Sequence, residues 1–339
     1  MREYKSKLEK LTKYTNARTL YLFKVSVATG YNLLRERMPV NPANSIDIMW
    51  LTTSADGTIK ILRQRSAVDR RFCFVKKYAY RNKLAVVTGA SSGIGKAYAK
   101  ELAARGCHVV LAARSKDKLD AMAGEINLQY GVKAYALACD LSKANAPRQL
   151  AEQISELGLS VDILINNAGV GTYGCFEELD PEREQEEIML NTASLVDLTH
   201  RLLPNMLRQT DGVIVNVASM AAFMPCAYST VYGATKAFVL SFSEALWAET
   251  RERGVRVLAL CPGATETGFF DAVGSEEMGA GQKLSTPEKV VKAGFRGIDQ
   301  GRSYIIDGRN NYLMAQMIRF FSRRRVALIM ERMSKPKKY

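Results

Sequence analysis

Apolar residues follow two alternating patterns from residue 84 onward. Short apolar runs, typical of strands buried on both faces of a parallel sheet, alternate with longer segments that have the spacing of amphipathic helices. The expected strands are Leu84–Val87, Val109–Ala112, Lys133–Ala138, Val161–Ile165, Gly212–Val217, Val255–Leu260 and Ser303–Ile306. The expected helices are Ile94–Arg105, Lys116–Gln129, Ala146–Glu156, Pro181–Met206, Tyr228–Glu252 and Pro287–Gly294. This alternation favours right-handed parallel crossovers and predicts an α/β fold with one doubly wound, seven-stranded parallel sheet.

Both ends of the chain lie outside this alternation. Residues 1–82 show weak periodicity and are expected to form a basic N-terminal extension, either a docking segment or the result of a start assigned too far upstream. Residues 83–309 hold the alternating pattern and are the expected main domain. Residues 310–339 place apolar side chains between arginines, which predicts a basic amphipathic C-terminal helix and tail. Such a helix either lies on an anionic membrane or packs over a pocket or a neighbouring subunit, and the pattern leaves both open.

The net charge of +14 is concentrated at the two ends. Residues 1–83 hold 18 basic and 6 acidic residues, and residues 318–339 hold 8 and 1, whereas the segment between them is slightly acidic. Basic ends indicate contacts with membranes or polyanions at the ends alone. No zinc, helix-turn-helix or aromatic-rich RNA-binding pattern occurs, so no specific nucleic-acid partner is expected.

Cysteine and histidine usage predicts neither disulfides nor a metal centre. The six cysteines lie singly, without a C-x-x-C pair, as is typical of reduced thiols in the cytosol. The two histidines, His108 and His200, do not cluster with other ligands. No apolar run reaches about 18 residues, and no secretory signal opens the chain. We therefore expect a cytoplasmic protein or one at the periphery of a membrane.

The stretch Leu84–Gly95, LAVVTGASSGIG, combines a buried strand, a glycine turn and the start of a helix. Glycine has no side chain to keep phosphates from the backbone, and the first N–H groups of a helix attract an anion. The spacing T-G-x-x-x-G-x-G differs from the commoner G-x-G-x-x-G but fits the same dinucleotide-binding context. The expected cofactor contacts in this turn are Gly89, Ser91, Ser92, Gly93, Ile94 and Gly95.

Residues at the ends of the second and third expected strands indicate whether NAD or NADP is the cofactor. Arg114 follows the second strand, where arginine accommodates the 2′-phosphate of NADP and an acidic residue binds the free 2′-OH of NAD. Arg114 therefore favours NADP, while nearby Asp117 is a weaker rival that favours NAD. Asp140 and Leu141 follow the third strand and are expected to contact the adenine, although Asp140 could equally cap the next helix.

Tyr232 and Lys236 are four residues apart, which places a phenol and an ammonium on one helix face. A phenol with a pKa of about 10 needs a nearby positive charge to act as an acid or base near neutral pH. Among 15 tyrosines, about one Y-x-x-x-K match is expected by chance. Ser219, just after the preceding strand, and Asn191, in the long helix before that strand, add weight to Tyr232.

Several motifs occur together in order and at fitting distances. They are Thr88-Gly89-x-x-x-Gly93-x-Gly95, Asn166-Asn167-Ala168-Gly169, Asn191, Ser219, Tyr232-x-x-x-Lys236 and Pro262-Gly263. This set resembles the short-chain dehydrogenase/reductase family over about residues 83–308. The resemblance implies a Rossmann-type fold, a dinucleotide-binding catalytic domain at residues 83–309 and a homo-oligomer, either a dimer or a tetramer.

The resemblance also implies a role for each site residue. Tyr232 would exchange the proton with the carbonyl oxygen, and Lys236 would lower the Tyr232 pKa and hold the nicotinamide ribose. Ser219 would hydrogen-bond the substrate oxygen, and Asn191 would position a water. Further cofactor contacts are implied at Asn167, Ala168 and Gly169 on the adenosine side and at Pro262, Gly263, Thr265 and Thr267 over the nicotinamide.

The substrate class is inferred from softer signals. Residues 93–99 and 114–119 resemble the branch that contains 17β-hydroxysteroid dehydrogenases and long-chain 3-oxoacyl reductases. The glycine-rich stretch Gly268–Ser285, with Phe269-Phe270, is either a lid over an apolar ligand or an ordinary loop. We expect an NADP(H)-dependent oxidoreductase that interconverts a carbonyl and a secondary alcohol on a lipid-like substrate. The alternatives are a dinucleotide sensor without turnover and a polyanion-binding protein acting through residues 1–83.

Overall fold

The structure is a computed structural model, and it divides the chain into two compact units, Met1–Val75 and Lys76–Tyr339. The described residues are 22–28, 31–37, 45–53 and 59–67, for which only the backbone is described, together with 77–273 and 284–336. Sequence predictions for residues 1–21, for residues 274–283 of the glycine-rich stretch and for residues 337–339 lie outside the described residues.

The N-terminal unit contains an antiparallel four-stranded sheet in the order β1-β2-β3-β4. Its strands are β1 (Leu22–Ala28), β2 (Tyr31–Arg37), β3 (Ser45–Thr53) and β4 (Ile59–Ala67). The sequence analysis missed these strands, because their alternation of apolar and polar residues is short, as at Val25-Ser26-Val27. The basic extension therefore contains regular strand structure between residues 22 and 67.

The second unit is built on a seven-stranded, all-parallel sheet in the order β11-β10-β9-β8-β5-β6-β7, which confirms the predicted fold class. Its strands are β5 (Leu84–Thr88), β6 (His108–Ala113), β7 (Ala134–Ala138), β8 (Ile163–Asn166), β9 (Gly212–Val217), β10 (Val255–Cys261) and β11 (Tyr304–Ile306). The strand order reverses between β5 and β8, and in such sheets ligands bind at the carboxyl ends beside that point.

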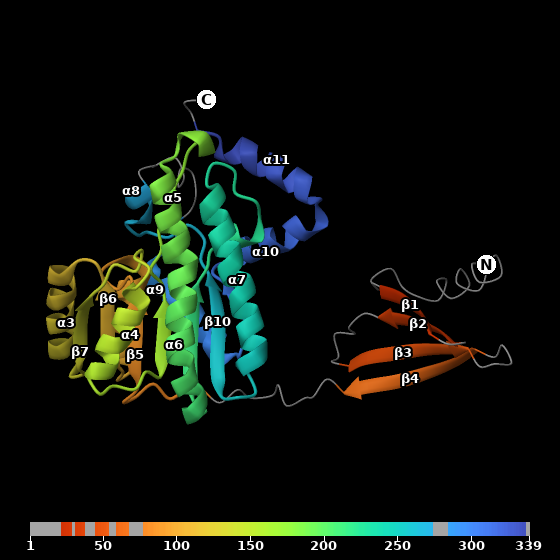
Figure 1. Cartoon of the computed structure of the whole chain (residues 1–339), viewed down its shortest axis with the longest axis horizontal. Helices are drawn as coiled ribbons and strands as arrows, with labels where there is room; N and C mark the ends of the chain where they lie inside the picture. Colours follow the sequence, from red (N-terminus) through yellow and green to blue (C-terminus); the bar gives the residue numbers. More distant parts are fainter. Residues whose placement is uncertain are drawn as a thin grey trace. The chain divides into compact units, whose positions relative to one another are not determined.

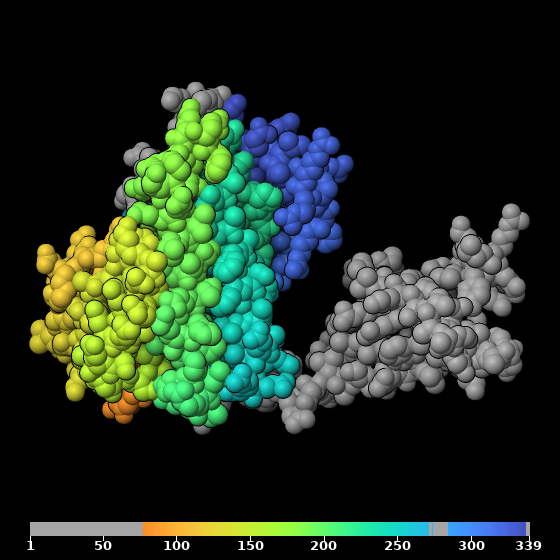
Figure 2. Space-filling view, viewed as in Figure 1, coloured from red at the N-terminus to blue at the C-terminus, as the bar shows by residue number. Residues whose placement is uncertain are grey.

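Helices cover both faces of this sheet (Figure 1). One face packs against α2 (Gly93–Ala104), α3 (Lys116–Tyr130) and α9 (Pro287–Asp299). The other packs against α4 (Ala146–Glu156), α6 (Ser194–Gln209) and α7 (Thr230–Thr250), which Figure 2 shows as a continuous layer. Within β5, Ala85 and Val87 belong to the first apolar cluster and Val86 to the second. The continuous apolar run of β5 therefore arises because both of its faces are buried.

The expected helix Pro181–Met206 is interrupted by a single turn of π-helix. Its parts are α5 (Pro181–Ile188), the π turn Met189–Ala193 and α6. A π turn adds a residue to one helical turn and often occurs at functional sites. It places Asn191 in the widened turn, a position that apolar spacing alone does not reveal.

The C-terminal segment forms two helices in place of the single helix predicted for it. They are α10 (Arg309–Met317), followed by a 3-10 turn, and α11 (Arg323–Ser334). The break lies at Phe321, which is extended, and Ser322 caps α11 by accepting a hydrogen bond from Arg325 N at 3.4 Å. The single-helix prediction was wrong here because the apolar spacing continues across a local cap.

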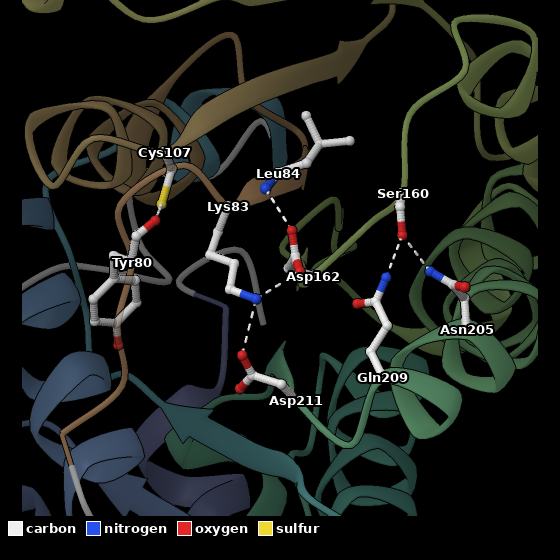
Figure 3. A network of polar contacts seen from close by, with 9 residues as sticks. All are labelled: Tyr80, Lys83, Leu84, Cys107, Ser160, Asp162, Asn205, Gln209 and Asp211. Carbon is white, nitrogen blue, oxygen red and sulfur yellow. Dashed lines mark hydrogen bonds and ion pairs between the residues drawn. The ribbon is translucent and has the colours of Figure 1, made fainter.

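At the amino ends of the strands, a polar network ties three of them together (Figure 3). Lys83 Nζ lies 3.0 Å from Asp162 Oδ1 and 2.9 Å from Asp211 Oδ2, while Asp162 Oδ2 accepts from Leu84 N at 2.8 Å. Burial disfavours the charge of Lys83, but its hydrogen bonds to Asp211 and Asp162 outweigh this and raise its pKa. The network fixes the starts of β5, β8 and β9, so that their other ends are held in register.

Candidate active site

A cavity of about 1480 Å³ lies at the carboxyl ends of the strands. This volume exceeds the several hundred cubic ångströms of a typical single-ligand pocket, so a cofactor and a substrate can share it. Among the residues predicted for the site, those that line it are Gly89, Ser91, Ser92, Gly93, Ile94, Arg114, Asp140, Leu141, Asn167, Ala168, Gly169, Ser219, Tyr232, Lys236, Pro262, Gly263, Thr265 and Thr267. Gly95 and Asn191 are not among the lining residues and lie behind this wall.

The glycine turn after β5 requires glycine at three positions. Gly89 and Gly93 have positive φ angles of 62° and 51°, which residues with side chains rarely adopt. A Cβ atom on Gly95 would lie 2.3 Å from Gly89 O, so α2 can approach the turn only because the side chain is absent. The capping residue Ser92 makes no side-chain hydrogen bond, and this leaves the helix N–H groups open toward the cavity.

Asn167 braces this turn from the end of β8. Its Nδ2 donates to Thr88 O at 2.9 Å and Gly89 O at 3.2 Å. Thr88 Oγ1 in turn accepts from the backbone N–H groups of Asn167 and Ala168, both at 3.0 Å. The Asn167 side chain therefore holds the glycine turn in shape.

Arg114 and Asp140 both line the cavity, and their predicted contacts with the adenosine part of a cofactor stay predictions. Asp140 accepts hydrogen bonds from the backbone N and the hydroxyl of Ser142, so it forms a local turn and does not cap α4, whose cap is Asn145. Partial burial acts against the Asp140 charge, but these bonds and the nearby Arg114 charge lower its pKa. Asp117, the rival that favours NAD, lies in the first turn of α3 and is not a lining residue.

Tyr232 and Lys236 lie on one buried face of α7, at 9% and 5% exposure. Lys236 Nζ lies 5.7 Å from the centre of the Tyr232 ring and donates to Val217 O at 2.9 Å. Ser219 follows β9, acts on the Tyr232 phenol by lowering its pKa, and accepts from Ala221 N at 3.1 Å. The structure therefore brings three of the four predicted catalytic residues together at the cavity wall.

Burial controls the proton affinities of this pair. It raises the pKa of Tyr232 to about 12, although the hydrogen bond from Ser219 acts in the opposite direction. Burial also lowers the pKa of Lys236 to about 8, with Glu187 opposing the shift. Desolvation of the phenol is the largest cause of this shift and Lys236 is not among the causes, so the lowering of the Tyr232 pKa by Lys236 stays a prediction. Tyr232 is thus a protonated phenol near neutral pH and can donate a proton.

Asn191 uses its whole side-chain amide within the protein. Its Oδ1 accepts from Val170 N at 3.0 Å, and its Nδ2 donates to Val170 O at 2.9 Å and Thr235 Oγ1 at 3.1 Å. These bonds tie the loop after β8 to α7 and so position Lys236. The role of Asn191 in holding a water stays a prediction. A Cβ atom on Gly169 would lie 3.1 Å from Asn191 Oδ1 and 3.3 Å from Lys236 Nζ, so both groups face this glycine.

The turn after β10 joins the cavity to the C-terminal helices. Pro262 O accepts from Met220 N at 2.9 Å, and Thr265 Oγ1 donates to Gly263 O at 2.9 Å. A Cβ atom on Gly263 would lie 2.3 Å from the Asn311 side chain, so α10 packs directly on this turn. The predicted nicotinamide turn is therefore also a support for the substrate side of the cavity.

The apolar wall of the cavity comes from the glycine-rich stretch and from the C-terminal segment. Phe269 and Phe270, which the sequence analysis singled out, both line it, and the Phe269 ring lies 5.3 Å from the Tyr232 ring. The C-terminal residues that complete the wall are Met314, Met317, Ile318, Phe321, Val326, Ile329, Met330 and Met333. Of the alternatives that the sequence left open for this segment, packing over a pocket is the one that these contacts support.

The structure gives no sign of a metal centre or a membrane span in the part of the chain it describes. Among those residues, no group of three or more histidine, cysteine or acidic side chains could hold a metal ion. None of the described helices is long and apolar enough to cross a bilayer.

Comparison with known proteins places this architecture in a family. A family model described as short chain dehydrogenase matches residues 83–278. The chain is 41% identical over 182 residues to a very-long-chain 3-oxoacyl-CoA reductase from Anas platyrhynchos, a match that covers 52% of this chain and 58% of that protein. It is 37% identical over 207 residues to a 17-beta-hydroxysteroid dehydrogenase type 3 from Danio rerio, covering 59% and 67%. The chain thus spans less than two thirds of the first of these relatives.

Solved structures agree with this assignment. A short-chain dehydrogenase from Sphingobium yanoikuyae in complex with NADPH superposes with a TM-score of 0.65 at 32% identity, covering 73% of this chain and 94% of that one. A short-chain dehydrogenase/reductase from Burkholderia phymatum in complex with NAD superposes with a TM-score of 0.63 at 26% identity, covering 70% and 93%. The predicted relationship is confirmed: this chain belongs to the short-chain dehydrogenase/reductase family.

Proposed function

We propose that this chain is an NADP(H)-dependent oxidoreductase that interconverts a carbonyl and a secondary alcohol on an apolar, lipid-like substrate of the steroid or 3-oxoacyl type. Tyr232 protonates the carbonyl oxygen in reduction and removes the proton in the reverse direction. One observation carries the proposal: Tyr232, Ser219 and Lys236 line the same cavity as the glycine turn, with Tyr232 and Lys236 both buried.

The glycine turn fits the phosphates of a dinucleotide. The turn packs so closely on α2 that a Cβ atom on Gly95 would lie 2.3 Å from Gly89 O. The first N–H groups of α2 lack a side-chain cap and can therefore bind an anion. Arg114, exposed at the adenosine end, supports NADP because its guanidinium can pair with a 2′-phosphate. The relatives include structures with NADPH and with NAD, so the NADP preference rests on Arg114. When bound, the cofactor supplies the hydride.

The protein residues handle the proton. Burial raises the pKa of Tyr232 to about 12, so the phenol carries its proton at neutral pH, and its donation depends on groups that stabilise the phenolate. Ser219 is placed to hydrogen-bond the same substrate oxygen, and the Lys236 ammonium, 5.7 Å from the Tyr232 ring, stabilises the phenolate that donation leaves. Asn191 keeps α7 and the loop after β8 in this arrangement.

The apolar wall supports a lipid-like substrate. The methionines and aromatic residues of α8 (Phe269–Val273), α10 and α11 face the cavity beyond Tyr232. Flexible methionine side chains adapt to long or bulky apolar ligands. The names of two relatives, a very-long-chain 3-oxoacyl-CoA reductase and a 17-beta-hydroxysteroid dehydrogenase, agree with such substrates.

We also propose that residues 310–339 make peripheral contact with an anionic membrane. Leu313 and Phe320 are 52% and 84% exposed, and arginines at 319, 323, 324, 325 and 332 are exposed on the same segment. An apolar and cationic surface of this kind binds anionic lipid. Co-sedimentation with anionic vesicles that is lost on deleting residues 310–339 is the expected result; unchanged sedimentation contradicts it.

The deciding experiment is a screen of NADPH oxidation with 3-oxoacyl thioesters, steroid ketones and small aldehydes. The expected result is turnover of the first or second class and little turnover of small aldehydes, because these cannot fill the apolar wall. Tight NADPH binding without turnover of any carbonyl compound would indicate a dinucleotide sensor. The oligomeric state, expected to be a dimer or tetramer, is measured on the same preparation by light scattering.

A further inference from the structure

Two buried carboxyl groups lie close to the proposed catalytic pair and have no part in the mechanism above. Glu184 and Glu187, on α5, are 7% and 0% exposed. Both reach the hydroxyl of Thr172, in the loop after β8: Glu184 Oε1 is hydrogen-bonded to it, and Glu187 Oε2 lies 3.0 Å from it. Their other oxygens, Glu184 Oε2 and Glu187 Oε1, are buried without a hydrogen-bond partner in the described part of the chain.

The chemistry of one hydroxyl limits the charge of this pair. A threonine hydroxyl has one proton to donate, so it can donate to one carboxylate and must accept from the other group. The second carboxyl can donate to it only when it carries a proton itself. Two adjacent buried carboxylates also repel each other and lack solvation. A proton on Glu187 therefore relieves both the repulsion and the missing hydrogen bond.

Glu187 is the member of the pair whose proton comes off near neutral pH. Burial raises its pKa to about 7, the Glu184 charge acts in the same direction, and Thr172 and Lys236 oppose it. The charge of Glu187 acts on both Lys236 and Tyr232 of α7. The other titratable groups that face these two are Cys226, beside Tyr232, and Cys261 of β10, beside Lys236.

The ammonium of Lys236 lacks a carboxylate partner within ion-pair distance in the described part of the chain. Its hydrogen bond goes to a backbone carbonyl, Val217 O, and none of the ion pairs within 4 Å in the described chain includes it. Its counter-charge must therefore act over a longer distance through a buried, weakly screened region. The chain places Glu187 one helical turn before Asn191, which is bonded to Thr235 on the same helix as Lys236.

We propose that Glu187, which contacts the same Thr172 hydroxyl as Glu184, is a positioning residue whose carboxylate sustains the ammonium of Lys236 above neutral pH. This role rests on the proposed function of Tyr232 and Lys236. The sign of the effect follows from the two titrations. Glu187 becomes anionic as the pH rises through about 7. Its negative charge is one of the effects that keep the pKa of buried Lys236 at about 8 and not lower, so without it Lys236 loses its proton at a lower pH.

The test is the pH dependence of kcat/KM for NADPH-dependent reduction between pH 6 and pH 9. Glu187→Gln keeps the size and hydrogen-bonding capacity of the side chain but never becomes anionic. We expect it to match the unaltered protein within about twofold at pH 6 and to fall about fivefold to tenfold below it at pH 8.5, since its alkaline limb moves down by nearly one pH unit.

Glu186→Gln is the matched control. It removes the same charge one residue away, from an exposed side chain that pairs with Lys143 at 2.8 Å. We expect its profile to follow that of the unaltered protein. A loss of the same factor at every pH in Glu187→Gln would mean a structural role, and an equal shift in Glu186→Gln would mean a general charge effect. Either result overturns the inference.

Infrared difference spectroscopy between pH 6 and pH 8 provides a readout that does not depend on turnover. The unaltered protein and Glu186→Gln should both lose a protonated-carboxyl band that Glu187→Gln lacks. Thr172→Val, which removes the shared hydroxyl, should move this loss to higher pH because the carboxylate loses its donor. Absence of the band in an active enzyme overturns this inference alone. Presence of the band in a protein that reduces no carbonyl compound overturns the proposed function, and with it the role of Glu187.

Discussion

The two ends of the strands in the seven-stranded sheet, called here the amino edge and the carboxyl edge, pair their charged side chains in opposite ways. At the amino edge, Lys83 lies between Asp162 and Asp211, and Asp162 also accepts from Leu84 N, so each charge has a close partner (Figure 3). At the carboxyl edge, Lys236 donates to a backbone carbonyl and has no close carboxylate among the described residues, and Glu187 shares the Thr172 hydroxyl with Glu184. Close pairing holds charges fixed and stabilises the fold, whereas incomplete pairing shifts pKa values toward neutral pH, where proton transfer is useful.

The largest expected effect comes from removing the acid at the carboxyl edge. Tyr232→Phe should lower kcat by about 10³-fold, near the middle of the range for general acid catalysis, and leave the Kd for NADPH within about twofold. Tyr173→Phe is the matched control, because it removes another phenol of the cavity wall, whose hydroxyl donates to Ser334 O. Steady-state kinetics and cofactor fluorescence measure both. Retained activity in Tyr232→Phe would mean that a different group is the acid.

The second prediction removes a charge at the amino edge, where a loss of stability and not of activity is expected. Asp162→Ala leaves Leu84 N buried without its acceptor and removes one partner of Lys83, so the free energy of unfolding should fall by about 2 kcal/mol. Urea denaturation measures this, and kcat should stay unchanged. Asp197→Ala, which breaks an exposed pair with Arg201, should cost less than about 0.5 kcal/mol. A large loss of kcat in Asp162→Ala would show that the two edges are not separate in function.

A smaller effect is expected at the rim of the carboxyl edge. Arg114→Ala should raise the KM for NADPH by about tenfold, the equivalent of one charge-assisted hydrogen bond, and leave the KM for NADH nearly unchanged. Lys116→Ala, which removes a nearby exposed cation paired with Asp120, should alter neither constant. Equal changes in both constants for Arg114→Ala would refute the assignment of NADP.

The fold could be predicted from the sequence because both sides of the sheet are covered. Burial on both faces turns strands such as β5 into continuous apolar runs, and the helices between them keep the amphipathic spacing. The glycine turn was equally readable, since a close approach at Gly95 leaves room for no other residue. These features are local, and local patterns are what a single sequence displays.

Other features escaped prediction because they depend on distant contacts or on small local departures. Thr172 and Glu187 look like ordinary polar residues until α5 and the loop after β8 are brought together. The π turn at Asn191 inserts one residue without changing the apolar spacing around it. The break at Phe321 depends on a single capping serine. None of these leaves a periodic signal.

The last helices of the chain are attached at two separate points. Asn311 packs on the turn at Gly263, and Ser334 O accepts from Tyr173 Oη at 2.8 Å. Between these anchors, α10 and α11 add apolar surface to the cavity while the proposed acid and its neighbours come from earlier in the chain. Substitutions in α10 and α11 can therefore change the width and depth of the cavity, and with them the length of ligand that it admits. The proposed catalytic residues need not change at the same time.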